Sequence, residues 1–130
     1  MRYFLQTRAH SFQNAFEGVW YVIRTQKNAW IHSIATLLVV LFAIWLNLTV
    51  RDWAVLVLAV GFVWAAEFIN TALEAIVDLA SPNQHPLAKI GKDVGAAAVV
   101  IAACSSAIVG FLILGPPLWD KLSKVLNQIH

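Results

Sequence analysis

Three stretches of this sequence are long enough and apolar enough to cross a lipid bilayer, and they restrict the possible folds more than any other feature. Residues 30–50 contain no Lys, Arg, Asp or Glu, and residues 94–119 are equally free of these charges. Residues 53–66 form a third uncharged run, which continues into a mostly apolar segment. A spanning helix needs ~20 predominantly apolar residues. We therefore predict transmembrane helices over residues 30–50, 53–80 and 92–115.

The composition supports a membrane protein and excludes several other classes. The chain is 60% hydrophobic and 12% charged, whereas soluble domains are ~45–50% apolar and ~25% charged. A net charge of +2 is too small and too scattered to indicate nucleic-acid binding. Cys104 is the single cysteine, so neither an intrachain disulfide nor a zinc site of Cys/His spacing is expected. The 130 residues suit one compact all-α membrane domain.

The segments outside the three predicted spans have different characters. In residues 1–28, large apolar side chains recur at intervals of mostly three or four residues, which predicts an amphipathic helix. This helix either lies in the membrane interface or packs against the chain's own bundle. Residues 81–91 contain two prolines and are expected to form a loop. The GPP sequence at residues 115–117 is expected to end the third span, leaving residues 116–130 as a short amphipathic tail.

The distribution of Lys and Arg predicts the orientation in the membrane. One side of the predicted topology carries six of these residues and the other side three. Cytoplasmic loops are enriched in Lys and Arg, so the N-terminus and the loop at residues 81–91 are expected in the cytoplasm. The side with six comprises Arg2, Arg8, Arg24, Lys27, Lys89 and Lys92, and the other comprises Arg51, Lys121 and Lys124.

The second predicted span carries an unusual stripe of polar side chains. Glu67, Asn70, Glu74 and Asp78 are spaced so that, at ~100° per residue, they occupy a helical face roughly 80° wide. Carboxylates in a membrane are costly unless they are solvated, paired or protonated, and they usually mark a functional site. Lys92 can pair with one of these acids but not with all of them. The alternative is a set of interhelix polar contacts without chemistry.

A second group of polar residues precedes the third predicted span. Lys92 and Asp93 are adjacent at the expected start of this helix, on the same side of the membrane as the end of the stripe. A helix N-terminus with a lysine suits phosphate binding. The alternative is a solvated charge pair, and the small residues that follow, from Gly95 to Ala98, are interpreted as a packing face.

The residues alone leave two classes of function open. The stripe and Lys92 fit a site that holds a metal and a phosphate group at the cytoplasmic interface. The same acids also fit a small oligomeric channel or a proton-coupled transporter. No P-loop, GxGxxG or protein-kinase motif occurs in the chain, so none of these known folds would hold a nucleotide here.

Three motifs in order resemble the prokaryotic diacylglycerol kinase and undecaprenol kinase family, a group of small integral membrane lipid kinases. They are E-x-x-N-T-A-x-E-A-x-V-D from Glu67, HPLAK from His85, and K-D-x-G-A-A-A-V from Lys92. The resemblance implies a homotrimer in a bacterial plasma (inner) membrane, with active sites shared between subunits. It also implies phosphorylation of a lipid hydroxyl with ATP and Mg²⁺, an alcohol-directed phosphotransferase reaction.

The resemblance further implies a role for each matching residue. Glu67 corresponds to the general base for the lipid hydroxyl, and Asn70 to the amide beside it. Glu74 corresponds to a metal-binding acid that also contacts ATP. Asp78, Lys92 and Asp93 correspond to residues around the nucleotide. His32 is interpreted as a structural histidine at a helix interface, and His85 is assigned no role.

The family resemblance has one departure that affects the expected site. The family usually has glutamate in an R-T-E-x-N-x-x-I-H stretch, where it shares the metal, whereas this chain reads RTQKNAWIH with Gln26 at that position. Gln26 can offer Mg²⁺ and ATP a neutral oxygen without negative charge. A further interpretation is therefore an inactive relative that acts as a scaffold. The RTQKN and HPLAKIGKDVG stretches favour undecaprenol as the lipid, with diacylglycerol next.

Overall fold

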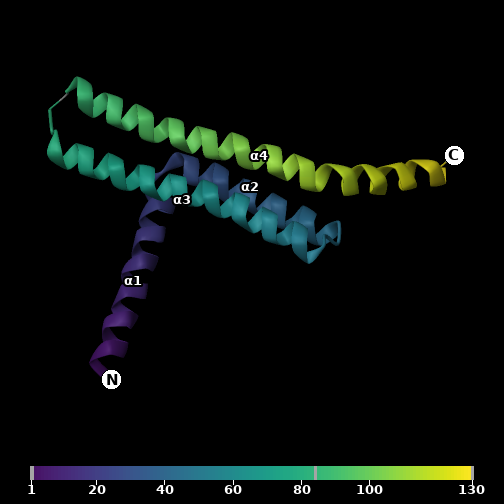
Figure 1. Ribbon diagram of the computed structural model, residues 1–130, viewed down its shortest axis with the longest axis horizontal. Coiled ribbons are helices and arrows are strands. Elements are labelled where there is room, and N and C mark those ends of the chain that lie inside the picture. Colours follow the sequence, from purple (N-terminus) through teal and green to yellow (C-terminus); the bar gives the residue numbers. More distant parts are fainter. Residues whose placement is uncertain (1, 84, 130) are drawn as a thin grey trace.

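The computed structural model describes residues 2–83 and 85–129, and these residues are almost entirely helical (Figure 1). The helices are α1 (Arg2–Thr25), α2 (Lys27–Trp45), α3 (Val50–Ala80) and α4 (Pro86–Ile129). By length and hydropathy, α2, α3 and α4 can each cross a membrane. The prediction of an all-α membrane protein with an N-terminal helix and three spanning helices is confirmed.

The three long helices run side by side, and α1 leaves this bundle at a steep angle (Figure 1). α3 packs along α4 over much of its length, whereas α2 contacts both helices less extensively. Near its end α1 buries Val22, but Phe12, Phe16 and Trp20 are exposed. Within one chain, α1 therefore does not lie along the bundle, and its position in the membrane interface stays a prediction.

The connection between α2 and α3 lies earlier than the sequence suggested. α2 ends at Trp45, so the prediction of one span over residues 30–50 is wrong at its C-terminal end. Asn47 adopts a positive φ of 53° in the turn, a conformation that Asn tolerates better than most residues. Thr49 then caps α3 in a capping box with Asp52. Asp52 is consequently part of the first turn of α3, which begins three residues before the span predicted from residue 53.

α4 extends beyond the predicted third span in both directions. It begins at Pro86, so the loop predicted at residues 81–91 is shorter. Proline suits the first helical position because its missing N–H would be unpaired there, and the ring Nδ1 of His85 accepts the Leu87 N–H at 3.2 Å. At the other end, α4 continues through Pro116 and Pro117. The prediction that GPP separates the helix from a tail at residues 116–130 is therefore wrong.

A contact after the two prolines joins this part of α4 to α2. Proline inside a helix removes a backbone hydrogen bond and costs ~3 kcal/mol. After the prolines, Lys121 donates from Nζ to the Trp45 carbonyl oxygen at 2.6 Å, and its charge lies 4.3 Å from the centroid of the Trp45 ring. This contact ties the last part of α4 to the end of α2.

Candidate active site

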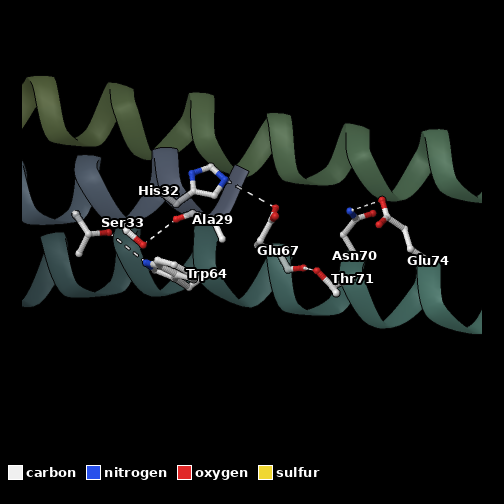
Figure 2. A network of polar contacts seen from close by, with 9 residues as sticks. Ala29, His32, Ser33, Trp64, Glu67, Asn70, Thr71 and Glu74 are labelled. Atoms are coloured by element: carbon white, nitrogen blue, oxygen red, sulfur yellow. Dashed lines mark hydrogen bonds and ion pairs between the residues drawn. The ribbon is translucent and has the colours of Figure 1, made fainter. Parts of the chain in front are cut away.

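The polar stripe of α3 faces the other two spanning helices, and its centre is buried (Figure 2). Glu67 is 1% exposed and Asn70 is 7% exposed, whereas most large apolar side chains of the spanning helices are on the outside. Charged residues are almost never fully buried without a partner. The burial of Glu67 therefore indicates an environment built around this carboxylate.

Glu67 points toward His32 of α2 (Figure 2). The His32 Nε2 and Glu67 Oε2 atoms are 3.8 Å apart, and within the described part of the chain both are buried without a hydrogen-bond partner. The His32 ring meets Trp64 edge to face, and Trp64 donates from Nε1 to the Thr36 hydroxyl at 3.1 Å. The structure thus places His32 beside the predicted base. α2 contains no Asp or Glu, so nothing in the sequence indicated that His32 would lie beside an acid.

Asn70, Glu74 and Gln26 form the next part of the site. Asn70 Nδ2 donates to Glu74 Oε1 at 3.2 Å, and Gln26 Nε2 donates to Glu74 Oε2 at 3.5 Å. On the other side of Asn70 lies Gly95 of α4, where an added Cβ would collide with Asn70 Oδ1. Asn70 is therefore held between Gly95 and Glu74. Gln26 and Glu74, which are far apart in the sequence, therefore lie next to each other.

The charged residues at the end of the stripe pair differently from the sequence-based interpretation. Lys92 Nζ lies 2.5 Å from Asp78 Oδ1, which confirms that Lys92 pairs with one acid of the stripe. Asp93 instead pairs with Lys89, one turn earlier in α4, at 2.5 Å. Lys92 and Asp93 are consequently not partners. Because α4 begins at Pro86, they also do not lie at a helix start.

The oxygen atoms of Glu74 and Gln26 would be suitable ligands for a magnesium ion that also binds the phosphates of a nucleotide. Among the described residues, no three His, Cys, Asp or Glu side chains cluster as a metal site. Mg²⁺ usually takes one or two carboxylates and completes its shell with water and substrate phosphates. Glu74 would supply the carboxylate, and a flip of the Gln26 amide group, whose nitrogen now faces Glu74, would present a neutral oxygen.

Comparison with known proteins identifies the family. The family model for prokaryotic diacylglycerol kinase matches residues 13–114, which include every residue of the site. The chain belongs to the prokaryotic diacylglycerol kinase family. It is therefore a membrane-spanning lipid kinase, and ATP is the co-substrate that a kinase implies.

Individual members of the prokaryotic diacylglycerol kinase family are similar over most of this chain. An undecaprenol kinase of Bacillus subtilis is 38% identical, and the match covers 83% of this chain and 88% of that protein. A diacylglycerol kinase of Synechocystis is 44% identical, over 83% of this chain and 62% of that protein. A diacylglycerol kinase of Escherichia coli is 31% identical, over 79% of this chain and 90% of that protein. These similarities favour the kinase over the channel or transporter alternative.

Proposed function

We propose that this lipid kinase transfers the γ-phosphate of ATP to the primary hydroxyl of a membrane lipid alcohol, with undecaprenol favoured over diacylglycerol. The observation that carries the proposal is the Glu67 carboxylate, which is 1% exposed and has one oxygen unpaired within the described chain. A buried acceptor without a partner is destabilising. Such an arrangement is retained where a substrate group supplies the missing hydrogen bond.

In the proposed reaction Glu67 acts as the general base. Its free oxygen accepts the hydroxyl proton of the lipid while the hydroxyl oxygen forms a bond to the γ-phosphorus. The bond between that phosphorus and the bridging oxygen of ADP breaks, and ADP leaves with the charge. His32, 3.8 Å from the same carboxylate oxygen, is placed to hold the hydroxyl in line by a second hydrogen bond.

The remaining polar residues are proposed to hold the nucleotide. Glu74 lies two turns from Glu67, about 10 Å along the helix axis, which leaves room for a phosphate group beside Asn70. Glu74 and Gln26 would hold Mg²⁺, whose positive charge would neutralise the phosphate oxygens. Lys92, now paired with Asp78, is placed to exchange this partner for a phosphate. Asp93 is proposed to contact the nucleotide from α4.

The charge distribution supports an orientation for this site. Gln26, Asp78, Lys89 and Lys92 lie at the same end of the helical bundle, where most of the Lys and Arg residues are found. We propose that this end faces the cytoplasm of a bacterial cell, where ATP is available, with the protein in the plasma membrane as a homotrimer.

The test is phosphate transfer from labelled ATP by the purified protein in mixed micelles, with undecaprenol and diacylglycerol offered separately. Glu67→Gln is expected to reduce the rate by 10²-fold or more, the usual range for loss of a general base. Asp120→Asn, an exposed acid at the opposite end of α4, is the matched control and keeps full activity. An unchanged rate in Glu67→Gln would show that another residue is the base.

A further inference from the structure

Trp64 joins α3 to α2 beside the Glu67 carboxylate (Figure 2). It precedes Glu67 by three residues, so the two side chains occupy neighbouring positions on one face of the helix. Its ring centroid lies 6.2 Å from that of His32, with 70° between the ring planes, within the ~4.5–7 Å range of favourable edge-to-face pairs. His32 Nε2 lies in turn 3.8 Å from Glu67 Oε2. Trp64 therefore contacts the histidine that faces the proposed base.

The orientation of the His32 ring depends on the groups that surround it. The last torsion of a histidine side chain has broad minima, so packing and hydrogen bonds decide how the ring is turned. Within the described part of the chain His32 Nε2 has no hydrogen-bond partner, and Trp64 is the aromatic group that packs on the ring. A smaller side chain at position 64 would let the ring rotate and carry Nε2 away from Glu67.

Trp64 is itself fixed by two contacts. Its Nε1 donates to the Thr36 hydroxyl of α2 at 3.1 Å, and the Phe68 ring packs 5.8 Å from its ring with the planes tilted by 31°. Trp64 lies about 21 Å along α3 from Val50, whereas the tryptophans of spanning helices are enriched at the two membrane interfaces. An unpaired indole N–H is costly in the hydrocarbon region. Thr36 therefore both satisfies this N–H and holds the ring in place.

We propose that Trp64, held by Thr36, is a positioning residue that keeps His32 Nε2 facing Glu67 Oε2. This inference rests on the proposed function, in which the lipid hydroxyl binds beside these two atoms. Thr36 lies one turn after His32 in α2, so its bond to Trp64 also sets the register of α2 against α3 next to the base. Neither Trp64 nor Thr36 belongs to the motifs that carry the family resemblance.

The test is a double-mutant cycle between Trp64 and His32, measured as phosphate transfer to the preferred lipid alcohol. Trp64→Leu is expected to lower kcat about fivefold to tenfold with the KM for ATP unchanged, because the hydroxyl is no longer held in line. In a His32→Ala background the same change is expected to lower kcat less than about twofold, since the ring that Trp64 orients is gone. Trp64→Phe keeps a ring beside His32 and should recover part of the loss. Phe62→Leu, at an exposed aromatic residue of the same helix, is the matched control and keeps full activity.

The outcomes separate this inference from the proposed function. If the unmodified protein phosphorylates no lipid alcohol, the proposed function fails and the positioning role fails with it. If it does, but Trp64→Leu lowers kcat by equal factors in the two backgrounds or not at all, only the positioning role is overturned. Thr36→Val removes the hydroxyl, keeps a similar shape and gives the same comparison if Trp64→Leu does not fold. It is expected to lower kcat about threefold when His32 is present and to have no effect in His32→Ala. Equal losses in the two backgrounds would again overturn the positioning role.

Discussion

Asn70 has the most constrained position of any site residue, because it is fixed from both sides. Its Nδ2 donates to Glu74, and its Oδ1 occupies the space that a side chain at position 95 would need. Gly95→Ala is expected to displace the end of this flexible side chain at little cost in stability. Glu74 Oε1 then loses the Asn70 donor, and kcat is expected to fall about tenfold, or ~1.4 kcal/mol of transition-state stabilisation.

Steady-state kinetics and thermal unfolding of Gly95→Ala in the same detergent check this prediction. Gly61→Ala is the control, because an added Cβ at Gly61 meets no described atom within 4 Å. It is expected to retain full activity. A Gly95→Ala protein that is destabilised in proportion to its loss of activity would contradict the argument, since the collision would then affect packing and not the site.

His32 is expected to act as a positioning residue for the lipid hydroxyl. His32→Ala removes the second hydrogen-bonding group beside Glu67, and kcat is expected to fall about tenfold to a hundredfold. His32→Gln returns an N–H donor near the same point and should recover part of the rate. Ser33→Ala is the control, because among the described residues Ser33 donates only to the Ala29 carbonyl of its own helix. Equal losses in His32→Ala and His32→Gln would indicate a packing role.

The site residues differ in how far the sequence could predict them. The stripe from Glu67 to Asp78 was visible because helical periodicity alone places these residues on one face. His32 and Gly95 were not assigned to the site, since their importance depends on the distance between helices. A histidine in an apolar span and a glycine in a run of small residues have ordinary structural explanations. Only the packing of α2 and α4 against α3 gives them a role beside Glu67 and Asn70.

At the scale of the helices, the uncharged runs located the three spans but not their ends. Hydropathy does not distinguish residues 46–49 from the helix before them. The position of the turn is set instead by the backbone conformation of Asn47 and by the helix cap at Thr49. The passage of α4 through Pro116 and Pro117 was equally hidden. Local sequence favours a break there, and the contact between Lys121 and Trp45 that follows the prolines is a tertiary one.

This contact leads to a prediction about the outer end of α4. Lys121→Met removes a hydrogen bond and a cation–π interaction, each worth ~1 kcal/mol. The helix beyond the prolines should then open more often, and its amides should exchange hydrogen up to roughly thirtyfold faster, since ~1.4 kcal/mol corresponds to a factor of ten. Hydrogen-exchange mass spectrometry of peptides covering residues 116–127 provides the measurement. Lys124→Met, which alters an exposed lysine on the same segment, should leave the exchange rates unchanged.

For the whole molecule, the question is whether one chain contains a complete site. Glu67, Glu74, Gln26 and Lys92 converge within one chain, but Asp93 does not join them. Its side chain is 61% exposed and pairs with Lys89, which is 78% exposed. The apolar surfaces of α2, α3 and α4 are also largely exposed, so a neighbouring copy has surface to pack against. In the homotrimer proposed above, we therefore infer that Asp93 serves the site of the adjacent subunit.

Mixing two inactive variants tests the sharing of sites. Glu67→Gln removes the proposed base of the site, and Asp93→Asn removes the carboxylate proposed to contact the nucleotide. Either variant alone is expected to be nearly inactive. In randomly mixed closed rings, half of the subunits retain Glu67 and half of their neighbours retain Asp93, so roughly a quarter of the sites would be complete. Co-expressed variants should therefore recover about that fraction of the unmodified rate. Activity no greater than the sum of the separate variants would show that each chain uses its own Asp93, which must then turn away from Lys89 when the nucleotide binds.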